Sequence, residues 1–408
     1  MNMNIALKKH SMKKYHPLLL YLFVENIGIS LLIPLVGAIY LDPKSSVFPE
    51  YFSQSQRQFF YGLSMVLTAT TIFGSSPLWG RVSDRFGRKP TISIGLIGLA
   101  LGYAICGLSI LYKNFIFLIF GKMVIGFSDG SKSAVLAAFC DTDKETRGLN
   151  FRWINIISCL GFLVGPLVGV YLSRMLAHQT LQFAFPLFIM ALASTINLGS
   201  ILWFFRETHH TRLSSIELSL AQLIIQSFKI LSDKTLKSIF CGIFMLALGY
   251  NILFNYLGLY LVTAFHLTSL QIGHFVTILT LGYLISITFI YPLIIKKMDF
   301  INPLILILAL SATALILLSY ISWLWACLVL VLIAISAMAL ADTLVMEHVS
   351  NQVTEQQGLA MGAMNSIFSI SVGCAGLFIG TLSSIGVGAP LFISGLSMVG
   401  AILLLRKH

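Results

Sequence analysis

Long apolar stretches alternate with short polar segments along almost the whole chain. A transmembrane helix needs about 20 consecutive apolar residues, and stretches of this kind are bounded by charged residues or by Gly, Pro, Asn and Ser. They cover residues 17–42, 58–80, 90–112, 115–140, 149–173, 183–205, 237–262, 271–295, 301–320, 323–346, 358–382 and 389–405. The pattern predicts an all-α membrane protein with twelve transmembrane helices and no separate soluble domain.

The composition excludes a water-soluble globule and changes how the net charge is interpreted. The 408 residues are 57% hydrophobic and 10% charged, with a net charge of +11. Connections on the N-terminal side of the predicted membrane hold most Lys and Arg, whereas the other side holds only Lys44, Arg57, Lys113 and Arg174. By the positive-inside rule we expect both termini in the cytoplasm and a multi-pass protein of the cytoplasmic (inner) membrane. The charge therefore marks orientation and predicts no nucleic-acid partner.

An internal repeat divides the chain. Residues 141–149, which lead to Asn155, align without gaps with residues 351–359, which lead to Asn365, at a constant offset of 210. We expect these two asparagines to hydrogen-bond between helices. The repeat predicts two pseudo-symmetric six-helix bundles, residues 1–205 and 237–408, with a site at their interface near mid-membrane. Between them, residues 206–236 contain apolar positions at helical spacing and predict an amphipathic helix along the cytoplasmic face: Ile216, Leu220, Leu223, Ile224 and Phe228. This is the architecture of a transporter.

The loop between the second and third stretches has a glycine-rich basic sequence. The residues that define its pattern are Gly80, Asp84, Arg85, Gly87, Arg88 and Lys89. Glycine permits a tight turn, and an acidic side chain can accept from a helix N-terminus. This loop, together with the span number and the repeat, resembles the major facilitator superfamily. The resemblance implies that the loop latches the cytoplasmic side while the transporter changes conformation.

Span five carries small residues four positions apart, followed by a proline. Gly161, Gly165 and Gly169 permit close approach of another helix, and Pro166 permits a bend. The stretch resembles the antiporter signature of the superfamily, although Val170 replaces its final glycine. Simple helix packing also explains these residues.

Span one places Glu25 and Asn26 shortly before a Gly and Pro pattern, and Asn26 is expected to line the substrate cavity. This pattern resembles the first span of the proton-coupled drug antiporters, the tetracycline and multidrug efflux branch. Hydrocarbon disfavours the ionised carboxylate, so Glu25 can load and unload a proton. Alternatively, a neutral Glu25 hydrogen-bonds between helices.

Span four has three charged residues along one helical stripe. Lys122 and Asp129 lie seven positions apart and Lys132 is one turn further. We expect Lys122 to balance charge or to contact an anionic part of the substrate. Asp129 is expected to serve as a reserve proton carrier, unless Asp129 and Lys132 merely neutralise each other. At the repeat offset Lys132 corresponds to Asp342, and the two are predicted to form an ionic gate.

Span seven offers a mixed polar and aromatic face formed by Tyr250, Asn251 and Asn255. These residues either line a cavity for an organic substrate or pack with their amides satisfied. One further motif, Gly126 to Gly130, satisfies the G-x-S-x-G pattern of serine hydrolases, but it lies within a predicted helix rather than at a strand-to-helix turn.

The predicted function is secondary transport by alternating access, with proton-coupled export of a small organic molecule by antiport. The alternative is proton-coupled uptake of an anionic nutrient or metal chelate, and an intramembrane serine hydrolase is a remote one. The expected partners are protons, a small-molecule substrate and the lipid bilayer. We expect a monomer without metal or cofactor, because the six cysteines are scattered singly and show no paired spacing.

Overall fold

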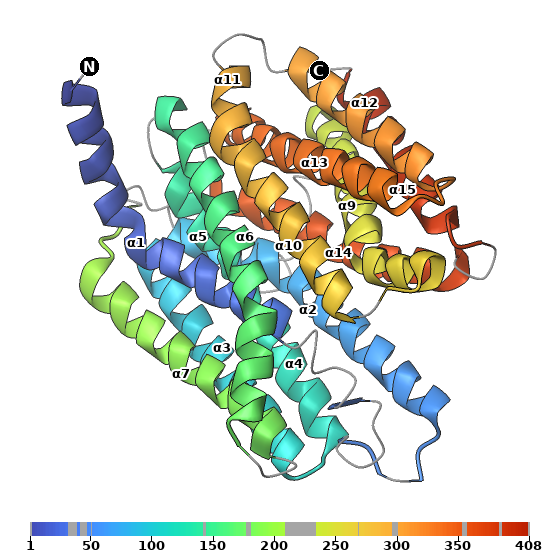
Figure 1. The fold of residues 1–408 in the computed structure, drawn as a ribbon. Coiled ribbons are helices and arrows are strands. Elements are labelled where there is room, and N and C mark those ends of the chain that lie inside the picture. The colour runs from blue at the N-terminus through green and yellow to red at the C-terminus, as the bar shows by residue number, and fades with distance from the viewer. Residues whose placement is uncertain are drawn as a thin grey trace. The chain divides into compact units, whose positions relative to one another are not determined.

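The computed structural model is mostly helical, with short turns between the helices, in the residues that it describes. These are residues 2–31, 39–40, 47–49, 51–141, 144–176, 181–208, 234–267, 269–295, 301–352, 357–382 and 386–406. Figure 1 shows the helices with their labels. The predicted amphipathic helix of the linker lies outside the described residues, which stop at residue 208 and resume at residue 234.

Within the described residues, each of the twelve predicted apolar stretches falls on one helix or on consecutive helices. The first six are α1 (Asn2–Leu31), α2 (Gln54–Phe86), α3 (Arg88–Leu111), α4 (Phe115–Asp129) with α5 (Lys132–Cys140), α6 (Lys144–Arg174) and α7 (Leu181–Phe204). The last six are α9 (Lys234–Phe265), α10 (Ser269–Ile285) with η4 (Ser286–Ile290) and α11 (Tyr291–Ile295), α12 (Ile301–Leu318), α13 (Leu324–Gln352), α14 (Gln357–Leu382) and α15 (Ala389–Leu405). The all-helical prediction is confirmed.

Several of these helices have the length and composition of membrane spans. Within the described residues, seven segments meet both criteria: 88–111, 149–173, 181–204, 238–258, 301–318, 324–351 and 360–379. Two shorter apolar segments, 278–294 and 389–405, follow the same composition. Since a bilayer core of about 30 Å is crossed by about 20 helical residues, the seven long segments are sufficient to span it.

The chain divides into two compact units. Unit 1 contains residues 1–143, 157–227 and 355–365, and unit 2 contains residues 144–156, 228–354 and 366–408. Each unit therefore takes in a short segment from the other half of the sequence. The two exchanged segments, 144–156 and 355–365, occupy equivalent positions in the repeat at the offset of 210.

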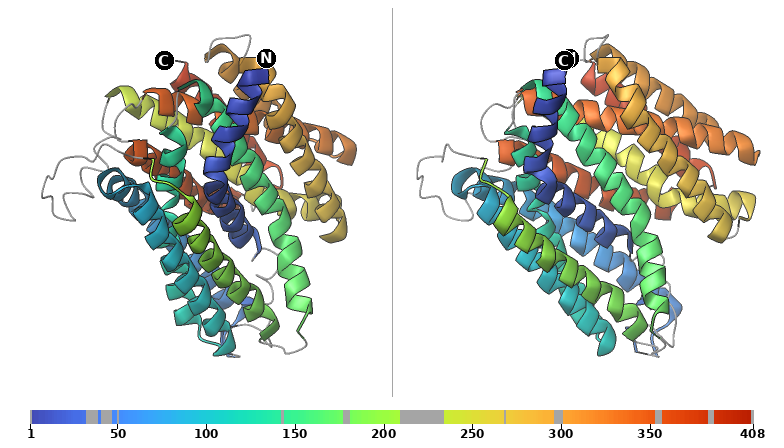
Figure 2. Two further views of the ribbon diagram at one scale, coloured as in Figure 1. Left: turned by 90° about the vertical axis from the view of Figure 1, so that its left-hand side faces the viewer. Right: turned by 60° about the vertical axis from the view of Figure 1, so that its left-hand side comes forward.

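The two units use the same helix neighbours. In unit 1, α3 packs along α7 and α4, α1 packs on α7, and α2 packs on α4. In unit 2, α12 packs along α15 and α13, α9 packs on α15, and α10 packs on α13. These are the same four pairs in repeat order. Figures 1 and 2 agree in placing α7 alongside α3 within unit 1.

The repeat-related asparagines make equivalent hydrogen bonds. In unit 2, Asn155 Nδ2 donates to Thr343 Oγ1 at 2.7 Å. In unit 1, Asn365 Nδ2 donates to Ser76 Oγ at 2.9 Å. Each bond joins an exchanged segment to a helix of its own unit, and this confirms the predicted bonding between helices.

Glycines let α6 approach α1 closely inside unit 1. A Cβ added at Gly161 would lie 2.5 Å from the carbonyl oxygen of Phe23, and one at Gly169 would lie 2.5 Å from that of Leu31. Because these neighbours are backbone atoms, they cannot rotate away. The small residues of span five therefore serve close helix packing against the helix that holds Glu25.

Replacing Gly161 by Ala should destabilise the protein. The added methyl group must push α6 away from α1, and overpacking of this kind costs about 1–3 kcal/mol. The matched control is Gly376→Ala on α14, where an added Cβ meets no atom within 4 Å; this change should be neutral or stabilise the helix by up to about 1 kcal/mol. Thermal unfolding of the two purified variants in detergent measures the difference, and equal melting temperatures would refute the close approach.

Candidate functional site

A buried ion pair joins α1 to α5 in unit 1. Glu25 on α1 is 5% exposed, and its Oε1 accepts a hydrogen bond from Lys132 Nζ at 2.7 Å. Lys132 is the first residue of α5, and its side chain is 21% exposed. The lysine therefore reaches the buried carboxylate from a more open position.

Asp129 adds a second carboxyl group to this pair. It is the last residue of α4, is 9% exposed and interacts electrostatically with both Glu25 and Lys132. The three side chains come from α1, α4 and α5 and form the cluster that we call the ion cluster.

The helix turn between Asp129 and Lys132 differs from the predicted continuous helix. Ser131 N donates to Ser128 O at 3.0 Å, and Ala134 N donates to Ser131 O at 2.9 Å. These i→i+3 bonds have 3₁₀ geometry, in which residues three apart lie directly one above the other. The tighter turn places Asp129 and Lys132 on the same side of the span, beside Glu25.

Two tyrosines from different helices line the ion cluster. Tyr21, one turn before Glu25, shares a hydrogen bond with Ser131 Oγ at 3.1 Å. Tyr103 on α3 lies against α1 at Gly28, where a Cβ would collide with the tyrosine hydroxyl. Both tyrosines are buried, so they shield the charges from lipid while offering polar hydroxyl groups.

The charge count of the ion cluster suits reversible proton binding. With both carboxyl groups ionised and the lysine protonated, the cluster has one net negative charge, and addition of a proton makes it neutral. An uncompensated charge costs several kcal/mol inside a protein, and two neighbouring carboxyl groups resist simultaneous ionisation. The arrangement can therefore hold one exchangeable proton.

Lys122 lies apart from the ion cluster. Its Nζ is 5.2 Å from the centroid of the Tyr40 ring and donates to Ser64 Oγ at 3.4 Å. Lys122 precedes Asp129 by seven residues, or about 10 Å along the helix. The three charged residues of the predicted stripe therefore lie at two places. Lys122 contacts the Tyr40 ring, whereas Asp129 and Lys132 belong to the ion cluster.

The other predicted cavity residues are largely engaged in packing. Asn26 Nδ2 donates to Leu22 O at 2.8 Å. In unit 2, buried Asn251 donates to Ser371 Oγ at 2.8 Å, and the Tyr250 ring stacks on Phe254 with centroids 5.4 Å apart. Asn255 is exposed but donates to Asn251 O at 2.8 Å. These contacts favour the packing interpretation of Asn26 and Asn251.

The predicted ionic gate joins residues of different units. Lys132 belongs to unit 1, where it binds Glu25, and Asp342 belongs to α13 of unit 2. Their pairing stays a prediction.

The glycine-rich loop is a one-residue turn between two helices. Gly87 ends α2 and precedes α3, with φ +106°, a conformation that side-chain-bearing residues rarely adopt. A Cβ at this position would also lie 2.5 Å from the Glu207 carboxylate. Gly80 is buried within α2, and Arg85 lies over the Phe86 ring at 5.2 Å.

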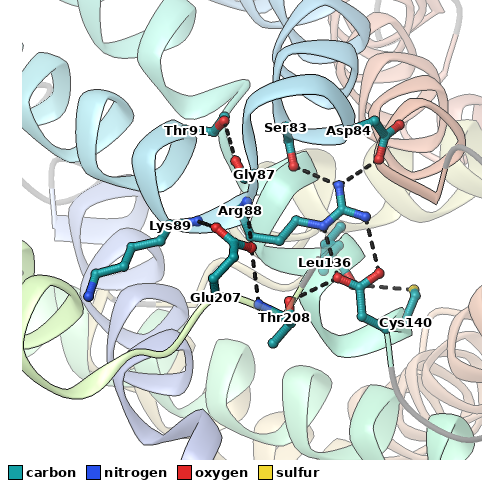
Figure 3. A network of polar contacts seen from close by, with 11 residues as sticks. Ser83, Asp84, Gly87, Arg88, Lys89, Thr91, Leu136, Cys140, Glu207 and Thr208 are labelled. Atoms are coloured by element: carbon teal, nitrogen blue, oxygen red, sulfur yellow. Dashed lines mark hydrogen bonds and ion pairs between the residues drawn. The ribbon is translucent and has the colours of Figure 1, made fainter. Parts of the chain in front are cut away.

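Arg88 is the centre of a buried polar network, drawn in Figure 3. The guanidinium donates to Asp84 Oδ1 at 2.6 Å and to Ser83 Oγ at 2.7 Å. It also forms a forked pair with Asp141, with distances of 2.9 and 3.1 Å. Arg88 thereby ties the end of α2 to the end of α5.

Glu207, which follows the end of α7, caps the start of α3. Its carboxylate accepts from Arg88 N at 2.9 Å and Lys89 N at 3.0 Å, and a negative charge is favourable at a helix N-terminus. Lys89 Nζ in turn donates to Leu202 O at 2.7 Å. The loop is therefore fastened to the end of α7 as well.

Sequence reasoning missed Asp141 and Glu207 as members of this network. Asp141 is the first residue of the repeat, and Glu207 is an acidic residue directly after an apolar stretch. Both acidic residues lie at ends of predicted spans, on the same side of the membrane as the basic loop. Their position on that side could have indicated that they pair with the basic residues of the loop.

The G-x-S-x-G motif has no hydrolase geometry. Ser128 lies inside α4, is 4% exposed and is followed by the 3₁₀ turn that positions Asp129. The residues serve helix packing: a Cβ at Gly130 would collide with the Ser75 hydroxyl on α2.

Comparison with known proteins gives consistent matches. The sequence model described as Major Facilitator Superfamily matches residues 18–376. The class H tetracycline resistance protein of Pasteurella multocida is 29% identical over 192 residues, which are 47% of this chain and 44% of that protein. The class B protein of Escherichia coli is 25% identical over 190 residues, which are 46% and 43% of the two chains. The matched region thus spans less than half the length of these relatives.

Solved structures match over nearly the whole chain. The crystal structure of the human organic anion transporter MFSD10 (TETRAN) has a TM-score of 0.81 and 20% identity, and the match covers 97% of this chain and 99% of that one. The E. coli fucose:proton symporter FucP has a TM-score of 0.74 and 13% identity, with 96% and 98% covered. At these identities the matches establish the fold.

Replacing Arg88 by Lys should destabilise the protein and weaken transport. A lysine cannot bond Ser83, Asp84 and both oxygens of Asp141 together, and losing two charge-assisted bonds costs at least about 2 kcal/mol. The control is Arg85→Lys, a change of the same type at a partly exposed side chain, which should stay within about 0.5 kcal/mol of the wild type. Melting temperatures in detergent provide the measurement, and an Arg88→Lys protein as stable as the control contradicts the network's role.

Proposed function

This chain belongs to the major facilitator superfamily, and we propose that it exports a small organic molecule in exchange for protons. Its membership makes it a secondary transporter of a membrane and not an enzyme. The hydrolase alternative is thereby excluded. We propose three further points: the class of substrate, its exchange for protons, and the outward direction of transport.

The single observation that supports proton exchange is the ion cluster. Glu25 and Asp129 are both buried, and one lysine, Lys132, pairs with Glu25 at 2.7 Å. Ionisable residues inside a membrane are costly and mark substrate or proton pathways. We assign the exchanged proton to Glu25, with Asp129 as the second carrier.

Lys132 supplies the means of coupling. When Glu25 is ionised, Lys132 is held by it. When Glu25 takes up a proton, the charge attraction between them is lost and the ammonium is released toward the open side, where its side chain is already 21% exposed. A substrate that competes for the same charges therefore binds to a different extent before and after proton uptake, and this difference is what couples the two movements.

Export by antiport is favoured over uptake by two similarities. The curated relatives include tetracycline resistance proteins, and the glycines of α6 resemble the antiporter signature of the superfamily. We accordingly propose an inner-membrane location with both termini in the cytoplasm, as the distribution of basic residues indicates.

A second candidate function is uptake of an anionic solute together with protons. Lys122 supports it, because its ammonium is partly buried above the Tyr40 ring and can contact a carboxylate-bearing substrate. An anionic solute that drives proton movement in the same direction as itself would favour this candidate.

Replacing Glu25 by Gln should abolish proton movement driven by substrate. The amide keeps the size of the side chain but cannot bind or release a proton in the physiological range. The measurement uses protein reconstituted into liposomes with an internal pH dye, to which tetracycline and a panel of small organic cations and anions are added. We expect wild-type protein to move protons with at least one of these solutes.

The matched control is Glu347→Gln, a change of the same type in unit 2. Glu347 accepts from the Tyr291 hydroxyl at 2.6 Å, and an amide oxygen can still accept that bond. This variant should keep proton movement. A Glu25→Gln protein that moves protons like the wild type would overturn the assignment and leave the fold intact.

A further inference from the structure

A small cavity lies beside Glu25 within unit 1, on the side of α3 and α7. Its walls come from three helices: Tyr21, Val24 and Glu25 on α1, Leu96, Leu99 and Tyr103 on α3, and Ser194 and Asn197 on α7. The cavity thus links the proposed proton carrier to a helix that contributes nothing to the ion cluster.

Asn197 is the unexplained residue of this cavity. It is 1% exposed, yet neither its Oδ1 nor its Nδ2 has a hydrogen-bond partner in the described part of the chain. An unsatisfied buried amide costs about 1–3 kcal/mol for each lost bond. By contrast, the neighbouring Ser194 hydroxyl donates to Met190 O at 2.9 Å.

Glu25 presents a third unsatisfied atom to the same surroundings. Its Oε1 is bound by Lys132, whereas its Oε2 accepts from no donor among the residues that the structure describes. Asp129 lies within hydrogen-bonding reach of the same carboxyl group. Glu25 on α1 and Asn197 on α7 therefore line one cavity. Together they have three buried polar atoms that make no hydrogen bond among the described residues.

The small volume of the cavity indicates which ligand can bind there. It offers a volume of about 10 Å³ to the centre of a water molecule, and one bound water requires about 10–15 Å³ and two to four polar partners. An organic substrate cannot fit. A water molecule matches the volume, the donor and acceptor groups of Asn197, and the acceptor Oε2.

We propose that this cavity is a binding site for a single water molecule that bridges Asn197 to Glu25. The water bonds to the Asn197 amide either by accepting from Nδ2 or by donating to Oδ1, and it donates one hydrogen to Glu25 Oε2. Asn197 is then a positioning residue, which acts on the carboxyl group only through the water.

The bridge affects how tightly Glu25 holds its proton, a consequence that rests on the proposed function. A water that donates to Oε2 favours the ionised carboxylate. The other groups facing Glu25 are Tyr21 on its own helix, Tyr103 on α3, Asp129 on α4 and Lys132 on α5. None of them is altered when Asn197 is changed.

The test is infrared difference spectroscopy on purified protein in nanodiscs as pH is varied, in H₂¹⁶O and in H₂¹⁸O. A bound water gives an O–H stretching band that shifts with the oxygen isotope, and the Glu25 carboxyl C=O band reports its protonation. In wild-type protein we expect an isotope-sensitive water band that changes together with the Glu25 band. In Glu25→Gln both changes should vanish.

Replacing Asn197 by Leu tests the bridge itself. Leucine has a similar volume but no polar group, so the water loses two of its three bonding atoms. We expect loss of the water band and a shift of the Glu25 titration to higher pH by about one unit, the tenfold change expected when one hydrogen bond to a charged group is lost. The control is Asn155→Leu in unit 2, which also removes a buried amide but should leave the Glu25 titration unchanged.

The outcomes separate this inference from the proposed function. A wild-type spectrum with no isotope-sensitive band that responds to Glu25 overturns the water site, even if Asn197→Leu cannot be purified. An unchanged titration in Asn197→Leu also overturns it. A water band that behaves as expected in a protein that moves no protons in liposomes would instead refute the proposed function and leave the water site standing.

Discussion

The ion pair between Glu25 and Lys132 is the interaction on which the account of this transporter depends. Two opposite charges 2.7 Å apart attract strongly where water is scarce, but each also loses its hydration on burial. The pair is therefore stable only while both partners are charged and in contact. Asp129 tips this balance by adding a second negative charge. A proton on either carboxyl group restores neutrality, and a proton on Glu25 also removes the attraction that holds Lys132.

The rest of unit 1 holds these three side chains together. Gly161, Gly165 and Gly169 bring α6 against the backbone of α1, and the 3₁₀ turn after Asp129 places Lys132 beside Glu25. At the other end of α5, Arg88 joins Asp141 to Asp84. Since α5 is a nine-residue helix, its two ends carry the ion cluster and the loop network respectively. One short helix therefore connects the two groups of charged residues directly.

Sequence pattern predicted the helices well and the side-chain partners less well, for physical reasons. Apolar length alone determines where a span lies, so the described parts of all twelve stretches lie on helices. The repeat correctly indicated the bonds of Asn155 and Asn365. The partner of Lys132 depends instead on which helices become neighbours and on the local 3₁₀ turn, neither of which periodicity contains. The role of Asn197 could not be predicted from the sequence either. A single amide in an apolar stretch is common, and only the cavity around it shows that its polar atoms lack partners.

The most direct test of the central claim is to count the protons bound by the ion cluster. Purified protein in a weakly buffered solution is taken through a pH step, and proton uptake per molecule is compared with that of a Glu25→Gln, Asp129→Asn double variant. The account predicts that the wild-type protein takes up one proton more than the double variant. Equal uptake by the two proteins across the pH range in which both stay folded would contradict it.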